Sequence, residues 1–404
     1  MADTETLFIP VEHYLPMEDY DRCGFPLKGL RGFDQDGVVD KPFYRWMTAR
    51  SPLTGAEYRV KAVPLTGSPN GHIAGYIVEI NIPACTVGHN LLLVNGVPMA
   101  SKLACLLFKH WLITSGCSKY GLRLVQFDKV RLHSVTPTYL FRCDDLADAH
   151  AARREFSVHS EGVLNPKVYK KGSPNPAFSV GPVDNATSYI KHRQYLVSAY
   201  VKDGTATKAY AVFDSPAIEQ AIRAEAAKYL RVEVAFGGVW LQKMKLDTPD
   251  AWLLADGREN PYKVGVDLIR KVLLLDADLR TRAPKEEHIA QLSEADRNIL
   301  RWHLAAGRMS TRQHPLILAK PTVHDQNVYF ARVKDRLIES MKVDISILWA
   351  VQSKEMSPRL ADLLKFGGQL KPLASIADHI FSPASVPELI ERLEDMIEAI
   401  MPDH

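Results

Sequence analysis

A segment that begins at residue 72, in which apolar residues alternate with other residues, constrains the fold more than any other part of the sequence. Residues 72–82 read HIAGYIVEINI, and this β-branched alternation predicts a strand. Residues 83–90 are expected to form a loop. Residues 97–115 carry apolar side chains at helical spacing, which predicts an amphipathic helix. Strands are predicted again over 122–127 and 130–141. Strand, helix and two strands in succession predict an α+β fold with a mainly antiparallel sheet and covering helices.

The remainder of the chain extends this pattern and then changes. Strands are predicted over 187–200, 208–213 and 229–236, with a helix over 216–228. Residues 1–70 are rich in Pro, Gly, Asp and aromatic residues with weak periodicity, which predicts an irregular segment with short strands. We therefore expect three parts: an irregular segment over 1–70, an α+β domain over 71–284 and a helical module over 285–404.

Capping patterns mark the helices of the C-terminal module. Ser293 and Asp296 have capping-box spacing at the start of a helix over 292–306, and Gly307 stands where that helix should stop. A second helix is predicted over 325–341. A third begins at a capping box at Ser385, and its single apolar stripe is expected to pack on the core or to form a homodimer.

Composition narrows the class of protein. The chain has 404 residues, 46% hydrophobic, which suffices for two or three domains. Five cysteines without a CxxC pair indicate reduced thiols that pack as small apolar residues. No signal-peptide pattern or apolar run of membrane-helix length is present, so we expect a cytoplasmic protein that spans no membrane. A net charge of +3 neither requires nor excludes nucleic acid.

Common catalytic motifs are absent from the sequence. It contains no GxxxxGKS phosphate loop, HExxH or GxSxG motif, so a P-loop ATPase, a zincin and an α/β-hydrolase are not indicated. It also has no His-hydrophobic-His triplet, the metal motif of many relaxase-type nickases. A nicking enzyme of this sequence would have to bind its metal with other residues.

Four short stretches, in this order, carry the clearest functional pattern. They are PACTVGHN at 83–90, VRLHSV at 130–135, YIKHRQY at 189–195 continuing to YVK at 200–202, and LRVEV at 230–234. Each is common by itself. Together they resemble the filamentous-phage gene II replication proteins and related plasmid initiators, which carry a GHN loop, an RVD strand, a YxGK element with a following YxK, and an RIEV strand. Residues 300–308 and 328–345 also resemble the helical module of that family, so the resemblance covers about residues 75–347.

The resemblance implies a rolling-circle DNA replication initiator. Such an enzyme is a site-specific endonuclease and strand transferase. It nicks one strand of supercoiled origin DNA, holds the new 5′ end on a tyrosine, and later rejoins the displaced single strand. A phosphotyrosine diester keeps the energy of the cut bond, so resealing needs no ATP. Because tyrosine is a weak nucleophile at its ordinary pKa near 10, a divalent metal, Mg²⁺ or Mn²⁺, is expected to assist. A host helicase and polymerase are the expected partners in a bacterial cytoplasm.

The match to YxGK points to Tyr189 as the nucleophile. Lys191 and Arg193 follow it and would hold the scissile phosphate, and Lys202 is a second phosphate clamp. Tyr195 and Tyr200 are the alternative nucleophiles, and a structural tyrosine in a strand is the alternative for each.

Two departures from the family pattern bear on the chemistry. Ile190-Lys191 stands where YxGK has its Gly, and His133 replaces the Asp of RVD. An imidazole can also bind a divalent metal, and the change would favour Mn²⁺ over Mg²⁺. We therefore expect His133, Glu233 and His89 as metal ligands. The alternatives are a core histidine at His133, an ordinary ion pair of Arg231 or Glu233 with a neighbour, and a relative that binds origin DNA without cutting it.

Basic residues outside the motifs suit DNA-backbone binding. The helices at 292–306 and 325–341 could form a helix-turn-helix whose second helix reads bases with His324, Gln326 and Asn327. A structured-RNA-binding protein is a further alternative. The predicted DNA contacts are Arg193, Arg231, Arg153, Arg154, Lys170, Lys171, Arg332, Lys334 and Arg336, with Lys167 in the same basic segment.

Overall fold

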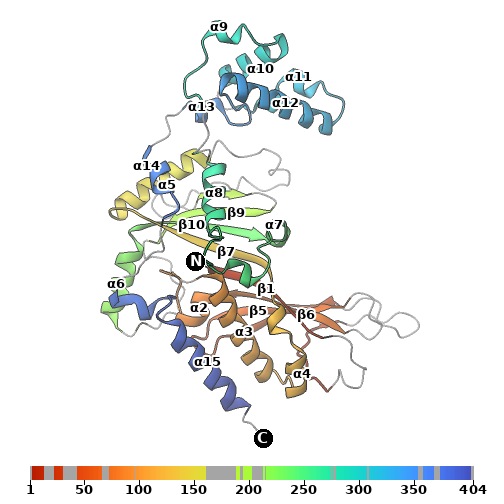
Figure 1. Ribbon diagram of the computed structural model, residues 1–404, viewed down its shortest axis with the longest axis vertical. Helices are drawn as coiled ribbons and strands as arrows, with labels where there is room; N and C mark the ends of the chain where they lie inside the picture. The colour runs from red at the N-terminus through yellow and green to blue at the C-terminus, as the bar shows by residue number, and fades with distance from the viewer. Residues whose placement is uncertain are drawn as a thin grey trace, which may run out of the picture. The chain divides into compact units, whose positions relative to one another are not determined.

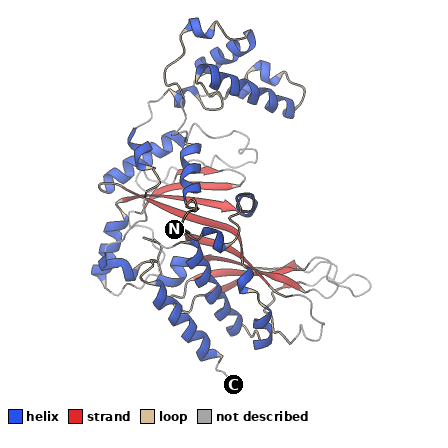
Figure 2. Cartoon of the chain, viewed as in Figure 1, coloured by secondary structure: helices blue, strands red, loops and turns tan. Residues whose placement is uncertain are grey.

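The computed structural model divides the chain into two compact units, each built from separate stretches of sequence. Unit 1 comprises 1–140, 202–264 and 367–404, and unit 2 comprises 141–201 and 265–366. The residues described are 2–12, 22–30, 43–65, 72–94, 96–160, 188–191, 194–202, 213, 215–273, 275, 279–306, 309–353, 358–367 and 374–401. Figure 1 follows the chain from end to end, and Figure 2 shows the mixture of strands and helices that makes this an α+β protein.

A sheet forms the centre of unit 1. Its strands follow the order β4 (Met47–Arg50), β5 (Glu57–Pro64), β6 (Ile73–Asn81), β1 (Ala2–Pro10), β7 (Arg131–Arg142) and β10 (Tyr229–Gly237). β1 pairs antiparallel with both β6 and β7. Strands β2 (Gly29–Leu30) and β3 (Phe43–Tyr44) form a second, two-stranded sheet.

Helix α3 (Val97–Thr114) packs on one face of this sheet. Ser101 of α3 donates to the buried carboxyl of Glu5 on β1 at 2.7 Å, and the Tyr58 hydroxyl on β5 donates to the Leu107 carbonyl at 2.9 Å. The last helix, α15 (Val386–Ile400), lies against α3, as Figure 1 shows, with Leu389, Leu393 and Ile397 buried. The prediction that the last helix packs on the core is therefore confirmed.

The other helices of unit 1 are short. They are α2 (Ile82–Val87), α4 (Lys119–Leu124), α6 (Pro216–Ala226) and α7 (Gly238–Met244), with the 3₁₀ turns η1 (Phe127–Lys129), η3 (Pro249–Trp252) and η5 (Ala374–His379).

Unit 2 contains a hairpin and a group of helices. Strands β8 (Ser188–Lys191) and β9 (Tyr195–Val201) pair antiparallel, and α5 (Leu146–Ser160) packs on both. A separate apolar cluster includes Ile299 and Leu300 of α10 (Glu294–Ala305) and Phe330 and Val333 of α12 (Val323–Met341). The remaining helices are α8 (Lys263–Val272), which begins in unit 1, α9 (Glu286–Ile289), α11 (Pro315–Leu318), α13 (Trp349–Gln352) and α14 (Pro358–Leu363), with the 3₁₀ turn η4 (Thr311–Gln313).

The sequence predicted many of these elements correctly. The strand at 72–82, the helix at 97–115, the strands at 130–141 and 229–236 and the helix at 216–228 correspond to β6, α3, β7, β10 and α6. Ser293 caps α10 by accepting from the Asp296 amide, as its spacing predicts. Ser385 precedes α15, but its hydroxyl donates to the Ile380 carbonyl, so the predicted capping box does not form. The predicted strand at 208–213 lies outside the described residues except for Phe213.

Two local predictions were wrong. Residues 83–90 were expected to be a loop, but α2 forms there because Asn81 caps it at the Ala84 amide and Pro83 suits the first turn. Residues 122–127 were expected to be a strand, but α4 extends to Leu124, Val125 forms an isolated bridge with Val11, and η1 begins at Phe127. Ser118 starts α4 by accepting from the Gly121 amide. In both places a side-chain cap starts a helix that the sequence pattern did not predict.

The N-terminal segment differs most from expectation, because β1 lies between β6 and β7 rather than in an irregular region. Its buried positions are Asp3, Glu5, Leu7 and Ile9. Two of these four carry carboxylates, so the period-two pattern that identifies a half-buried strand is hidden in the sequence. The divisions predicted at 70 and 284 likewise differ from the two units, whose boundaries fall elsewhere.

Within the described ranges, no helix is long and apolar enough to cross a membrane.

Candidate functional site

Arg231 on β10 is the centre of a buried charge cluster in unit 1. Its side chain is 1% exposed. The guanidinium contacts the Glu233 carboxylate at 2.8 Å and the Asp3 carboxylate at 3.1 Å, and it donates to the Asn90 carbonyl at 2.6 Å. Three segments far apart in sequence, β1, the turn after α2 and β10, are therefore joined through one side chain.

Lys202 and Asn90 complete this charge cluster. The Lys202 amine donates to the Asn90 side-chain oxygen at 2.8 Å, and the Asn90 amide lies 3.3 Å from the Asp3 carboxylate. Asn81, at the end of β6, donates a hydrogen bond to the Asp3 carboxylate at 3.0 Å. We call Asp3, Asn90, Lys202, Arg231 and Glu233 the charge cluster. It contains two cations and two carboxylates, so its formal charges balance.

Burial shifts the pKa of two members of the charge cluster. Desolvation raises the pKa of Asp3 above its usual range, and the nearby Arg231 opposes that shift. Burial lowers the pKa of Lys202 to about 8, and repulsion from Arg231 acts in the same direction. The Lys202 amine is therefore still mainly protonated at pH 7 but loses its charge in mildly alkaline solution.

A cavity of about 610 Å³ reaches the charge cluster. Lys202 and Asn90 line it, together with Asn81 and with Thr4, Arg59 and Glu79 from neighbouring strands. The positive charge of the Lys202 amine at one wall can attract an anionic oxygen such as that of a phosphate, whereas the Asn81 and Asn90 amides already donate to Asp3. The charge cluster thus has both a buried scaffold and a polar surface for a ligand.

The three residues expected to bind a metal have different contacts, although His89 lines the same 610 Å³ cavity as Lys202. His89 is buried, its Nε2 is 3.0 Å from the His379 carbonyl, and its ring stacks on Phe213 at 5.0 Å. Burial lowers the pKa of His89 to about 4, so the ring is neutral at pH 7. His133 is exposed and stacks on Phe8 with ring centroids 5.6 Å apart.

These positions do not form the predicted ligand set. Glu233, the third expected ligand, is engaged with Arg231. Within the described part of the chain, no group of three or more His, Cys, Asp or Glu side chains has a geometry that could hold a metal ion. The divalent metal therefore stays a prediction from the resemblance. His133 is also not the buried core histidine that was its alternative.

The tyrosines of the predicted site belong to unit 2. Tyr189 lies on β8, in register with Ser198 of β9, and Lys191 is two residues further along β8. Tyr195 and Tyr200 are the first and sixth residues of β9, and both are partly exposed. Burial raises the pKa of Tyr195, which makes its phenolate harder to form. Arg193 lies outside the described residues.

The predicted DNA-binding residues differ in how exposed they are and in whether they already form ion pairs. Arg154 and Arg332 are exposed, whereas Arg153 is 4% exposed on α5 and is not an open surface contact. Arg336 makes a bidentate pair with Asp296 at 2.7 and 2.9 Å, and Lys334 lies 3.5 Å from Asp335. Lys167, Lys170 and Lys171 lie outside the described residues.

The segment proposed as a helix-turn-helix contains an extra short helix. α11 separates α10 from α12, and only 319–322 separate α11 from α12. The side chain of Asn327 accepts from Arg312 at 2.9 Å, and Gln326 donates to the Lys320 carbonyl at 3.2 Å. His324 is exposed at the start of α12. Two of the three expected base-reading side chains thus already have partners within the helical module.

Sequence reasoning missed Asp3 and did not assign Asn90 a role. Asp3 belongs to a segment that was expected to be irregular. The alternation of Asp3 and Glu5 with Thr4 and Thr6, leading into Leu7, was the available signal. Asn90 was quoted within its motif, but nothing in the motif shows that its carbonyl and side chain both contact cations.

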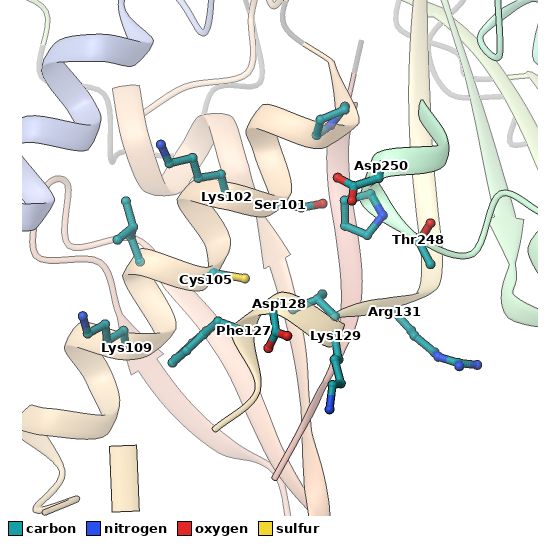
Figure 3. Close-up of a pocket in the computed structure, with 14 residues that line it drawn as sticks. Ser101, Lys102, Cys105, Lys109, Phe127, Asp128, Lys129, Arg131, Thr248 and Asp250 are labelled. Carbon is teal, nitrogen blue, oxygen red and sulfur yellow. The ribbon is translucent and has the colours of Figure 1, made fainter. Parts of the chain in front are cut away.

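A second, larger cavity of unit 1 has a different lining. It measures about 800 Å³ between α3, η1, the start of β7 and η3. Figure 3 shows the Ser101 and Cys105 side chains pointing from α3 toward the β7 side, whereas Arg131 points away from α3. No member of the charge cluster lines this cavity, so the smaller cavity is the candidate functional site.

Comparison with known proteins leaves the chain without a matched relative: no family model, no curated protein and no solved structure matches it.

Proposed function

We propose that this protein is a rolling-circle DNA replication initiator. It cuts one strand at an origin by forming a 5′-phosphotyrosine link and later rejoins the displaced strand. One observation carries the proposal: residues of three motif stretches meet in the charge cluster. Asn90 comes from GHN, Lys202 from YxK, and Arg231 and Glu233 from the R-x-E strand. These stretches lie far apart in sequence, so their meeting supports the view that they form one site.

The chemistry of the charge cluster suits phosphodiester transfer. Lys202 lines the cavity while its amine donates to the Asn90 side-chain oxygen, and its positive charge would stabilise negative charge on a phosphate oxygen there. Arg231 is a positioning residue, since it holds the Asn90 carbonyl and both carboxylates while remaining buried. Tyr189 is the proposed nucleophile and carries the 5′ end after the cut.

A covalent-adduct assay tests the function. The full chain is mixed with 3′-labelled single strands that tile the DNA beside its gene, in Mg²⁺ or Mn²⁺, and run on a denaturing gel. The 3′ label stays with the protein if the 5′ end is captured. We expect a protein–DNA band that Tyr189→Phe abolishes, while Tyr195→Phe and Tyr200→Phe retain it. Peptide mapping that places the adduct on Tyr195 or Tyr200 would keep the function and refute the assignment to Tyr189.

Lys202 gives a second prediction. Lys202→Met should lower the nicking rate about 100-fold, as expected when one donor to a developing negative charge is lost. In the wild type the rate should fall as the pH rises through about 8, because Lys202 then loses its charge. Lys202→Arg stays charged and should lose this decline. Lys102→Met, at an exposed position of α3, is the matched control and should leave rate and pH profile unchanged. A wild-type rate that is constant through pH 9 would contradict the assignment.

The replacement of the family's Asp by His133 favours a second candidate function. A relative that binds origin DNA without cutting it would need no metal ligand at this position, and the His133 ring stacks on Phe8. Tight binding to an origin fragment with no adduct in either metal would support this candidate over the nickase.

A further inference from the structure

A row of side chains crosses the sheet of unit 1 on the face opposite α3. Lys61 of β5 is in register with Ile77 of β6, Ile77 with Phe8 of β1, and Phe8 with Arg131 of β7. Residues paired in this way point to the same face. Glu5 has the opposite parity to Phe8 along β1 and contacts α3, so the row faces away from that helix. We call these four residues the cross-strand row.

The cross-strand row has an apolar centre between two cations, and aromatic rings adjoin it. Phe8 and Ile77 are partly exposed, and the exposed His133 ring stacks on Phe8 at an interplanar angle of 22°. Trp46 is 37% exposed, and Arg59 lies 4.9 Å from the centre of its ring. The rings are thus accessible near both ends of the row.

The cross-strand row leads toward the candidate functional site. The next residues in register on this face are Arg59, Glu79 and Thr6. Arg59 and Glu79 line the 610 Å³ cavity together with Lys202 and Asn90. This face of the sheet therefore reaches the cavity that Lys202 lines.

The charges on this surface suit a polyanion. Its described cations are Arg50, Arg59, Lys61 and Arg131, and their acidic neighbours are Glu57, Glu79 and Asp247. Arg131 is 63% exposed and lies 3.9 Å from Asp247, a loose contact. Exposed ion pairs are weak, so these guanidinium groups can exchange a carboxylate for a phosphate.

We propose that the cross-strand row, with Trp46, His133 and Arg59, binds single-stranded DNA and guides it into the cavity lined by Lys202. Bases stack on Phe8, His133 and Trp46, and phosphates contact Lys61, Arg59 and Arg131. Base faces are available for such stacking in a single strand but not inside a duplex. Four adjacent strands span on the order of 14 Å, so the row would contact a short stretch of the single strand. The inference rests on the proposed function for its choice of DNA.

Binding without cleavage tests this inference. In the Tyr189→Phe background, fluorescence anisotropy measures the affinity of the full chain for a labelled 15-nucleotide oligo(dT). Phe8→Leu keeps an apolar side chain but removes the flat ring, and it should weaken binding about ten-fold. Tyr120→Leu, at an exposed tyrosine on α4, is the matched control. Arg131→Gln should weaken binding and reduce the slope of log affinity against log salt by about one, whereas Lys102→Gln should do neither. Unchanged thermal unfolding shows that each variant is folded.

The outcomes separate the inference from the proposed function. If wild-type protein forms the tyrosine adduct but Phe8→Leu and Arg131→Gln bind oligo(dT) normally, the inference is overturned and the function stands. If no adduct forms but both variants lose affinity, the inference stands without the nickase. Tighter binding to oligo(rU) or to duplex DNA than to oligo(dT) would overturn the assignment of the surface to single-stranded DNA.

Discussion

Arg231→Met is expected to lower the free energy of unfolding by about 3 to 5 kcal/mol, the usual cost of removing one partner from a buried ion pair. The substitution keeps much of the side-chain volume but leaves Asp3 and Glu233 without their shared cation in a site that is almost closed to water. It also removes the donor to the Asn90 carbonyl. Urea denaturation at pH 7 measures the change.

An exposed ion pair on the same sheet provides the control. Arg59 pairs with Glu79 while 53% exposed, so Arg59→Met should cost no more than about 1 kcal/mol. Adding Asp3→Asn and Glu233→Gln to Arg231→Met should recover part of the loss, because no buried carboxylate then lacks a partner. Equal losses of unfolding free energy for Arg231→Met and Arg59→Met would show that the charge cluster does not stabilise the fold as a buried ion-pair network.

Glu5→Gln should change how stability depends on pH. Burial raises the pKa of Glu5 from 4.5 to about 8, and the hydrogen bond from Ser101 only partly opposes this. Between those values the unfolded chain releases the proton that the folded protein keeps. The contribution of Glu5 to stability is therefore complete below about pH 4.5 and is lost as the pH rises through about 8.

The quantity to measure is the difference in free energy of unfolding between Glu5→Gln and the wild type at each pH. The stability of Glu5→Gln relative to wild type should rise by about 1.4 kcal/mol per pH unit from about pH 5 to pH 8, because the variant has no proton to lose there. Urea denaturation at four pH values measures it. Glu57→Gln, at an exposed carboxylate, should show no such slope. Parallel stability curves for Glu5→Gln and wild type would contradict the raised pKa.

The sequence predicted those strands and helices in which the apolar residues of the local pattern are also the residues buried in the fold. β6 alternates regularly and lies half-buried in the sheet, and α3 buries Leu103 and Leu107 as its spacing requires. β1 could not be recognised in this way, because Asp3 and Glu5 occupy positions where an apolar residue is expected. Their burial depends on Arg231 and Ser101, which lie far away in sequence.

Only part of the candidate site could be predicted, because its other residues also depend on contacts between segments far apart in sequence. Motif spacing selected Lys202, Arg231 and Glu233, and the structure brings these three together. His89 lines the same cavity as Lys202, but its ring contacts His379 and Phe213. His133 stacks on Phe8 instead, since residue type alone does not fix which side of a strand or turn a side chain occupies. Asp3 required knowledge of the strand order, with β1 near the middle of the sheet.

The packing of α15 on α3 has a consequence for synthesis of the protein. The two helices are far apart in the sequence, and so are β1 and β10. A ribosome adds about 5 to 20 residues per second, so α3 emerges tens of seconds before α15 exists. During that interval the apolar surface of α3 that α15 will cover is exposed to other proteins. Such long-range pairing also slows folding. We therefore expect nascent chains of this protein to depend on a chaperone until translation reaches the last helix.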